Sequence, residues 1–285
     1  MSLFRRRPRE SPPAQERNTP SAPAPVPAAP PPRRLSYRLG NLQGVGNRER
    51  QEDSFAFVNA MDVHDMLEQG LFAVVADGMG GLRDGKQASE TAIAVLRAEF
   101  RGFDRGGGLG EQLRDAVKRA GEAVYAALGG QGGSTVVACL IYDGKLWYAS
   151  VGDSFLWLLR DGELLRLNRE DNMMNLRWLE CIRRGDFDPA AGREDPEAAA
   201  LTRFLGMEGF DGEIDFLRRP LALRDGDALL LCSDGVGAVL SDETVRDCLR
   251  FPSPEQSCAA LERAVLLESR PYQDNYTALV IRCGI

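Results

Sequence analysis

The sequence has very little histidine and no closely spaced cysteine pair. The chain has 285 residues, with one histidine and six cysteines, and no two of the cysteines form a C-x-x-C pair. A zinc site built from the usual cysteine and histidine ligands is therefore not expected. The single histidine, His64, lies in the polar stretch 62–69, and we interpret it as a surface loop residue.

Long apolar runs are also missing. No stretch is long enough to span a bilayer, and the arginines at 5–7 are followed by proline and polar residues rather than by the apolar core of a signal peptide. Three of the six cysteines lie inside apolar strand or helix patterns, which is typical of reduced, buried thiols. We therefore expect a cytoplasmic protein without membrane insertion.

Negative charge exceeds positive charge outside the first 34 residues. The net charge is -7, but residues 1–34 hold seven arginines and two glutamates, so the remainder carries -12. An acidic body argues against nucleic acid as the main partner. Residues 1–34 also hold ten of the sixteen prolines, which predicts a disordered tail ahead of one domain at 35–285. The tail is either a docking arm or a spacer, and its composition favours the spacer.

The apolar periodicity of residues 35–285 predicts several strands and helices. Asp143-Gly144 and Asp161-Gly162 each separate two strand patterns, which predicts two hairpins and an antiparallel sheet. The expected strands are 35–43, 54–58, 71–77, 134–142, 145–151, 154–160, 163–167, 228–232 and 275–283. The expected helices are 86–100, 111–128, 173–183, 241–249 and 253–269. Strands and helices in this order predict a helical layer over a sheet.

The stretch from Leu71 to Gly81 carries the most specific chemistry. Six apolar residues lead into Asp77, and Gly78-Met79-Gly80-Gly81 follows. A carboxylate at the end of a buried strand needs a partner, and a cation is the natural one because no lysine or arginine is adjacent. An ordinary junction between a strand and a turn, with aspartate as a turn former, remains an alternative for this stretch alone.

Carboxylates recur at the ends of other apolar runs. They are Glu52, Asp53, Asp77, Asp153, Asp234 and Asp274. Their recurrence suggests convergence on a shared cluster of hard divalent cations such as Mg²⁺ or Mn²⁺, which prefer oxygen ligands. Two such ions about 3.5–4 Å apart can ionise a bridging water and hold a phosphoryl group. Arg48 offers a planar fork suited to phosphate oxygens.

Other phosphate chemistries fit less well. No cysteine has an arginine at the C-x5-R spacing of a cysteine-based phosphatase. Residues 80–86 match the G-x-x-x-x-G-K pattern of a P-loop nucleotide-hydrolysing enzyme, after a strand and before a helix. However, Gln87 stands where a serine or threonine must meet Mg²⁺, and Asp77 would direct negative charge toward the phosphates. A P-loop NTPase is therefore an unfavoured alternative.

Six ordered motifs over residues 35–285 resemble the protein phosphatase 2C family, in its bacterial branch. They are Arg48-x-x-Gln51-Glu52-Asp53, Asp77-Gly78-Met79-Gly80-Gly81, Gly132-Gly133-Ser134-Thr135, Val151-Gly152-Asp153-Ser154, Ser233-Asp234-Gly235 and Gln273-Asp274-Asn275. The resemblance implies an α+β fold, a four-layer sandwich of two antiparallel sheets flanked by helix pairs. It also implies a metal-dependent protein serine/threonine phosphatase that hydrolyses phosphoserine and phosphothreonine with metal-activated water.

The resemblance further implies a role for each site residue. Two tightly bound Mn²⁺ or Mg²⁺ ions and a weaker third are expected. Asp77 bridges the two ions, Asp234 and Asp274 complete one shell, and Glu52 with the Gly78 carbonyl completes the other. Asp53 holds metal-bound waters, Arg48 the substrate phosphate, and Asp153 with Asp234 the third ion. The catalytic residues are thus Arg48, Asp77 and Asp153.

Some positions depart from the family pattern. Phe155 follows Gly-Asp-Ser where arginine is common, and Met79 stands where many eukaryotic members have histidine, so a metal-bound water must protonate the leaving group. Residues 185–200 match the variable flap of the family, so the choice of substrate does not follow. We expect phosphoprotein substrates of a serine/threonine kinase and a monomeric enzyme. The alternative is a non-catalytic phosphoprotein-binding domain of the same fold, but no metal aspartate is lost.

Overall fold

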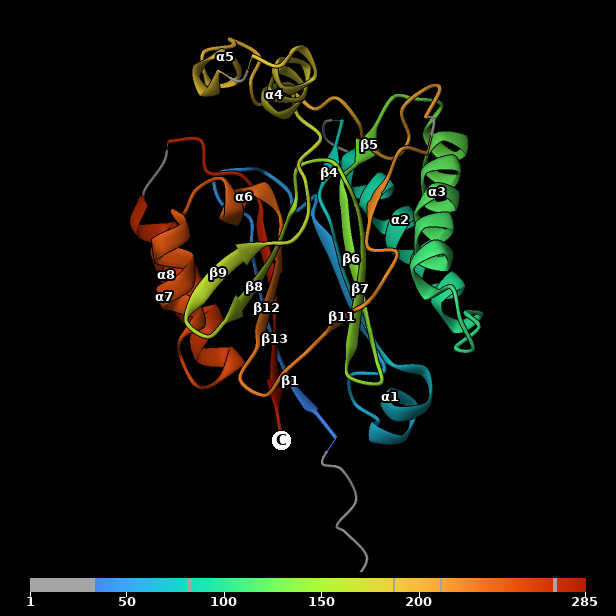
Figure 1. Ribbon diagram of the computed structural model, residues 1–285. Coiled ribbons are helices and arrows are strands. Elements are labelled where there is room, and N and C mark those ends of the chain that lie inside the picture. Colours follow the sequence, from blue (N-terminus) through green and yellow to red (C-terminus); the bar gives the residue numbers. More distant parts are fainter. Residues whose placement is uncertain (1–33, 81–83, 187, 211, 269–270) are drawn as a thin grey trace, which may run out of the picture. The chain divides into compact units, whose positions relative to one another are not determined.

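The computed structural model describes residues 34–80, 84–186, 188–210, 212–268 and 271–285. Everything below concerns this part of the chain, which belongs to one unit that begins at Arg34. The predicted tail at 1–34 lies outside the described residues, apart from Arg34, and so does Gly81. Figure 1 shows how the described elements are arranged.

Two antiparallel sheets form the centre of the unit. The five-stranded sheet runs in the order β1 (Ser36–Gly44), β13 (Tyr276–Gly284), β12 (Ala228–Cys232), β8 (Phe155–Arg160) and β9 (Glu163–Arg166). The other sheet runs in the order β10 (Asp215–Phe216), β7 (Lys145–Val151), β6 (Val136–Tyr142), β3 (Leu71–Ala76) and β2 (Ser54–Val58), and β11 (Leu221–Ala222) also pairs with β7. A short pair, β4 (Gly78–Met79) and β5 (Gly133–Ser134), stands apart.

Helices cover the outer face of each sheet. The helices α2 (Asp84–Arg101) and α3 (Leu109–Leu128) pack on the sheet that contains β3, and α7 (Asp242–Leu249) and α8 (Pro254–Glu268) pack on the sheet that contains β12. Figure 1 shows the resulting order of helices, sheet, sheet and helices from one side to the other. The predicted four-layer α+β sandwich is confirmed.

The alternation of side chains explains why whole strands are apolar. In β3, Leu71, Ala73 and Val75 pack between the two sheets, whereas Phe72 and Val74 pack under α2 and α3. Successive residues of a strand point to opposite faces, so a strand with cores on both sides has no polar face. The same alternation operates in β12.

The two predicted hairpins are confirmed by their turns. Asp143 and Asp161 take positive φ values of 50° and 53°, as an Asp-Gly turn requires. The strands they join, β6 with β7 and β8 with β9, pair antiparallel. Both neighbours of β3 are also antiparallel to it, whereas the P-loop motif belongs to strands of a parallel sheet.

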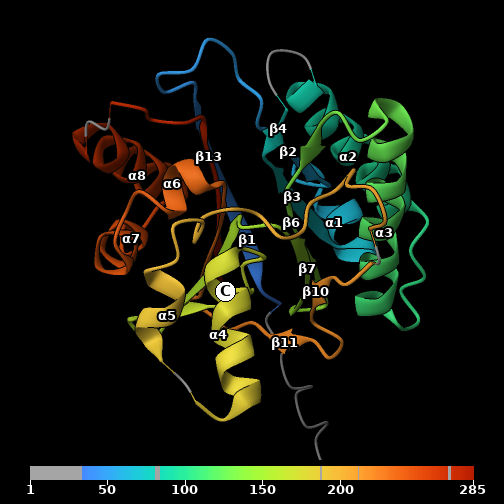
Figure 2. The same ribbon diagram turned by 90° about the horizontal axis from the view of Figure 1, so that it is seen from above.

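Four further helices complete the unit, and one of them corrects a prediction. His64 is exposed as expected but lies in helix α1 (Val63–Gln69), not in a loop, because Asp62 caps that helix by accepting hydrogen bonds from the backbone N–H groups of His64 and Asp65. The helices α4 (Met173–Arg184) and α5 (Pro189–Arg193) stand together beyond one end of the sheets (Figures 1 and 2). Helix α6 spans Asp234–Gly237.

The membrane prediction can be examined for the described part of the chain. Among the helices described, none combines the length and the apolar character that crossing a membrane requires.

Candidate metal centre

The carboxylates lie at the end of the sandwich where several strands start and stop. The strands β3, β7 and β12 end there. The strands β2, β8 and β13 begin there, because β2 is antiparallel to β3, and β8 and β13 are both antiparallel to β12. Every candidate carboxylate lies within two residues of the end of one of these strands. The antiparallel topology therefore gathers at one end residues that are far apart in the sequence.

Asp77 occupies the centre of the group. It continues the alternation of Leu71, Ala73 and Val75, so it belongs to the face of β3 between the two sheets. The pKa of Asp77 is raised well above its ordinary value, mainly by burial. The negative charges of Asp53, Asp234 and Asp153 raise the pKa further. The four carboxylates therefore lie close enough to interact in a region of low exposure.

Asp53 is fully buried beside Asp77. Its Oδ2 accepts a hydrogen bond of 2.8 Å from the Ser233 hydroxyl, while its Oδ1 has no partner among the described residues. Burial is the main cause that raises the pKa of Asp53 to about 6. A buried carboxylate oxygen without a hydrogen bond is costly unless a cation or a proton satisfies it.

Asp153 and Asp234 face the same region from two other strand ends. Burial raises the pKa of Asp153 to about 7, and the charges of Asp234 and Glu170 add to the effect. Burial also raises the pKa of Asp234, followed by the charge of Asp274. Asp234 begins helix α6, and its Oδ1 has no partner among the described residues.

Glu52 and Gly78 meet through close backbone packing. A Cβ atom at Gly78 would lie 2.1 Å from the Gly85 carbonyl oxygen and 2.8 Å from the Glu52 carbonyl oxygen, so no side chain fits. A Cβ atom at Gly85 would lie 2.9 Å from the Glu52 carboxylate. The Glu52 side chain therefore lies over the start of α2, and its Oε1 is buried without a partner among the described residues.

Arg48 and Asp274 form an ion pair at the edge of the group. Arg48 Nη2 lies 2.5 Å from Asp274 Oδ2, and the two side chains are 59% and 38% exposed. The hydrogen bond with Asp274 is the main cause that raises the pKa of Arg48, and the charges of Glu52 and Asp234 add to it. Arg48 is thus the accessible cation next to the carboxylates, where it can meet an incoming anion.

The donors fit a hard divalent cation, although they do not yet close around one. Among the described residues, no three Asp, Glu, His or Cys side chains are arranged so that they could jointly hold a metal ion. Asp274 is instead paired with Arg48, and the charge of Asp234 raises the pKa of Asp77. Buried oxygens without partners on Glu52, Asp53 and Asp234 are the ligand type that Mg²⁺ and Mn²⁺ prefer. Carboxylates repel one another until a cation balances them, so these oxygens can close around an ion once it binds.

Several polar residues hold the carboxylates in place, and the sequence alone did not assign them this role. Asn275 accepts from the backbone N–H of Glu52 and donates to the carbonyl oxygens of Val45 and Arg50, so it fixes the loop that carries Arg48. The Asp77 backbone N–H donates to the Thr135 hydroxyl, which also hydrogen-bonds Ser154 beside Asp153. These side chains belong to the six motifs, and their place in the motifs is the sequence feature that could have identified them as supporting residues.

The turn at Asp153 has its own support. Asp171, which is only 3% exposed, accepts a hydrogen bond of 3.2 Å from the Gly152 backbone N–H and forms ion pairs with Arg169 and Arg203. Asp171 stands immediately before Asn172, the residue that caps α4. The Asp153 turn is therefore tied to the base of the segment that holds α4 and α5.

A neighbouring strand supplies a cation beside the unexpected Phe155. The Arg166 guanidinium lies 3.7 Å from the centroid of the Phe155 ring and 5.1 Å from that of Trp157. It also donates to Asn168 and pairs with Glu170 at 3.2 Å. The charge of Arg166 lowers the pKa of Asp153, against the larger effects that raise it. A positive charge thus stands next to this turn although residue 155 itself is apolar.

The sandwich and the carboxylates at its end define a class of protein, a metal-dependent phosphatase fold, and comparisons with known proteins identify it. Residues 47–264 match the family described as protein phosphatase 2C. This match covers more than half of the chain, so the chain belongs to the protein phosphatase 2C family. The resemblance inferred from the six motifs is confirmed.

Individual relatives are bacterial. The chain is 34% identical over 213 residues to the serine/threonine protein phosphatase PstP of Mycobacterium tuberculosis, which covers 72% of this chain and 39% of that protein. The crystal structure of the M. tuberculosis phosphatase PstP/Ppp has a TM-score of 0.71 and 29% identity, and the match covers 88% of this chain and 100% of that one. A structure of the PstP catalytic domain with two manganese ions has a TM-score of 0.68 and 29% identity, and covers the same shares. The matched part thus spans about two-fifths of full-length PstP.

Proposed function

We propose that this chain is a metal-dependent protein serine/threonine phosphatase that hydrolyses phosphoserine and phosphothreonine in proteins. The observation that carries the proposal is the group of buried carboxylates whose oxygens lack partners at one end of a protein phosphatase 2C sandwich. The relatives named as serine/threonine phosphatases and the manganese-bound PstP domain support it. The cofactor is Mn²⁺ or Mg²⁺, with two tightly bound ions and a weaker third.

The residues of the centre divide the work between metal binding and substrate binding. Asp77 would contribute to both tight sites, Asp234 and Asp274 would complete one of them, and Glu52 with the Gly78 carbonyl would complete the other. When bound, the ions supply an activated water and neutralise the phosphoryl group. Asp53, whose Oδ1 has no partner among the described residues, would orient metal-bound waters, and Asp153 with Asp234 would hold the third ion.

Arg48 binds the substrate phosphate. Its guanidinium already pairs with one anion, Asp274, in an exposed position, and a planar fork suits two oxygens of a phosphate equally well. Binding of a cation by Asp274 would release Arg48 for this task. Arg48 is therefore the residue through which metal binding and substrate binding are coupled.

The direct test is hydrolysis of p-nitrophenyl phosphate and of a phosphothreonine peptide with Mn²⁺, with Mg²⁺ and with a chelator. We expect turnover with either metal, none with the chelator, and none in Asp77→Asn. The melting temperature of metal-free Asp77→Asn should not fall, because the substitution removes a desolvated charge. If the wild-type chain binds phosphopeptide but never turns it over, the chain is instead a non-catalytic phosphoprotein-binding domain of the same fold.

The cellular setting is proposed from composition and from the relatives. The substrates are phosphoproteins made by a serine/threonine kinase, the enzyme is a monomer, and the acidic body disfavours nucleic acid. All six cysteines are free thiols, five of them buried, which supports a cytoplasmic location. Residues 1–34 form a tail on a catalytic domain at 35–285.

A further inference from the structure

A hollow of about 590 Å³ lies at the end of the sandwich opposite the carboxylates. It is formed by the tip of the β6–β7 hairpin, the start of α3 and the segment 218–220 that precedes β11. Strand β7 joins the two ends: Lys145 at its start lines the hollow, and Val151 at its other end leads to Asp153. The size is that of a pocket for a small ligand or a large side chain.

The hollow is a positive area on an acidic domain. Four cationic side chains line it, those of Arg105, Lys145, Arg218 and Arg219, against the two carboxylates of Glu111 and Asp143. The chain after residue 34 carries a net charge of -12, so the excess of two positive charges in this hollow is opposite in sign to the domain as a whole. Such an area attracts anions over about one Debye length, roughly 8 Å at physiological salt.

The cationic side chains differ in how many hydrogen bonds and ion pairs they already make within the protein. Arg105 is committed to the fold, because its guanidinium donates to the carbonyl oxygens of Gln69, Phe100 and Phe103. Arg218 is 79% exposed and uses its Nε to bind Glu111 at 2.8 Å, which leaves the end of its fork open. Arg219 is exposed and takes part in no hydrogen bond or ion pair within the described residues.

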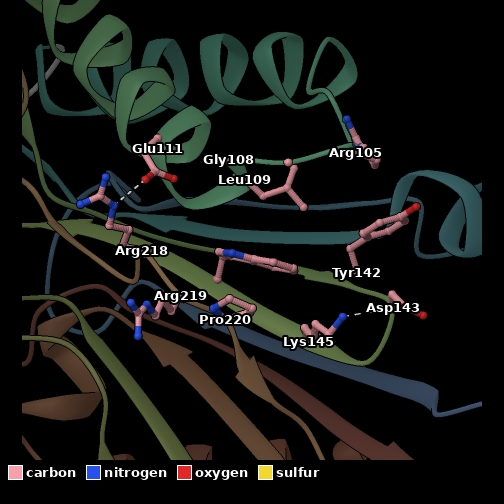
Figure 3. Close-up of a pocket in the computed structure, with 12 residues that line it drawn as sticks. Arg105, Gly108, Leu109, Glu111, Tyr142, Asp143, Lys145, Arg218, Arg219 and Pro220 are labelled. Carbon is pink, nitrogen blue, oxygen red and sulfur yellow. Dashed lines mark hydrogen bonds and ion pairs between the residues drawn. The ribbon is translucent and has the colours of Figure 1, made fainter.

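The positions of the side chains suit an amphipathic ligand. Figure 3 shows Arg218 and Arg219 on one side of the hollow and Lys145 on the other, with Leu109 between them. Leu109 is 4% exposed and Trp147, which also lines the hollow, is 8% exposed, so the inner surface is apolar. The exposed side chains of Arg218 and Arg219 lie beside this apolar surface. A peptide with one large apolar side chain and flanking acidic residues would use both parts.

We infer that this hollow is a docking site for an acidic segment of the phosphoprotein substrate that carries a large apolar side chain. The inference rests on the proposed phosphatase function, since it concerns how the same enzyme selects its substrates. The apolar side chain enters between Leu109 and Trp147, and the acidic residues pair with Arg218 and Arg219.

The geometry sets a minimum spacing between the docking segment and the phosphorylated residue. The seven residues of β7 span roughly 20 Å at about 3.3 Å per residue. An extended peptide therefore needs at least about seven residues to connect the two sites, and more when it follows the surface. A segment closer than this to the phosphothreonine cannot occupy the hollow while the phosphate is at the carboxylates.

The experiment compares three phosphothreonine peptides with the full chain and Mn²⁺. One is the phosphorylated core alone, and two carry the segment Asp-Glu-Trp-Glu-Asp separated from the phosphothreonine by a Gly-Ser spacer of about one or about fifteen residues, each made with the segment before or after the core. We expect the long-spacer peptide to gain about tenfold in kcat/KM over the core, through KM, because the second contact is intramolecular. The short-spacer peptide should gain nothing.

Variants locate the effect. Arg219→Glu should abolish the gain without loss of folding, because Arg219 has no partner to lose among the described residues, and Arg218→Glu should act in the same direction. Arg263→Glu, an exposed arginine on α8, is the matched control and should leave the gain intact. Hydrolysis of p-nitrophenyl phosphate should be the same in all of them.

Two outcomes separate failure of the inference from failure of the proposed function. Normal turnover with no dependence on the spacer or on Arg219 overturns the docking site and leaves the phosphatase intact. Calorimetry with the unphosphorylated Asp-Glu-Trp-Glu-Asp peptide does not need catalysis: binding that Arg219→Glu abolishes would support the docking site even if no substrate were turned over.

Discussion

Asp153 should make the metal-free protein less stable than it would be with a neutral side chain. Its pKa is raised to about 7, first by burial and then by the charges of Asp234 and Glu170. In the unfolded chain an aspartate has a pKa of about 4. The folded state therefore binds the proton more tightly, and Asp153 makes the stability fall as the pH rises from about 4 to about 7.

The size of this effect follows from the two pKa values. A rise from about 4 to about 7 corresponds to roughly 4 kcal/mol at a pH above both. Because Asp153 is partly exposed, solvent screening reduces this to about 2 kcal/mol. Asparagine has the same shape without the charge, so at pH 8 Asp153→Asn should raise the melting temperature of the metal-free protein by about 2–6 °C. At pH 5 the folded carboxyl is still mostly protonated while the unfolded one is already mostly ionised, so the difference should be about a third of its value at pH 8.

The measurement is thermal unfolding of both proteins at pH 5 and pH 8 in the presence of a chelator. Asp161→Asn is the matched control, since Asp161 is 82% exposed in a hairpin turn that asparagine tolerates. Added Mn²⁺ should stabilise the wild type more than Asp153→Asn, because ligand binding stabilises the folded state in proportion to affinity. An equal loss of melting temperature in Asp153→Asn at both pH values would refute the reasoning, since it would show a structural rather than an electrostatic role.

Three other predictions concern the centre and the tail. Arg48→Ala should lower kcat/KM by about ten- to a hundredfold, because a charge-assisted contact with the phosphate is worth roughly 1.5–3 kcal/mol. The Mn²⁺ affinity measured by calorimetry should change little, because the exposed ion pair with Asp274 is worth about 1 kcal/mol or less. An unchanged kcat/KM would remove Arg48 from the site. Asp153→Ala should keep two tight metal sites and lower kcat more for a phosphothreonine peptide than for p-nitrophenyl phosphate, whose leaving group needs little protonation; equal losses would argue against a role in proton supply. Deletion of residues 1–34 should leave intrinsic activity and melting temperature nearly unchanged, and a large drop in melting temperature would contradict a tail without a core.

The sequence predicted those features that are local. The period-two patterns and the Asp-Gly turns at 143–144 and 161–162 determined the central strands and their hairpins. The position of Asp77 at the end of an apolar run was enough to place it at a strand end. The helix at His64 was missed, because seven mostly polar residues carry little periodicity and the deciding contact is the Asp62 cap.

Non-local pairing accounts for most of what the sequence could not show. Arg166 reaches Phe155 because β8 and β9 pair in a particular register, and the sequence around residue 155 does not predict this contact. The ion pair between Arg48 and Asp274 joins residues 226 positions apart. The support that Asn275 gives to the Arg48 loop also depends on long-range contacts, its hydrogen bonds to the carbonyl oxygens of Val45 and Arg50.

The pairing of β1 with β13 has a consequence for synthesis on the ribosome. Strand β13 lies between β1 and β12, so the five-stranded sheet has no connection to β1 until the segment Tyr276–Gly284 has been made. Asp274 precedes that segment by two residues, so the metal centre is assembled in the same late step. We therefore expect a nascent chain to lack a complete metal centre throughout translation of its first 275 residues. A stop codon just before Tyr276 would leave both β1 and β12 with unpaired edges, and we expect such a product to aggregate rather than to act as a weaker enzyme.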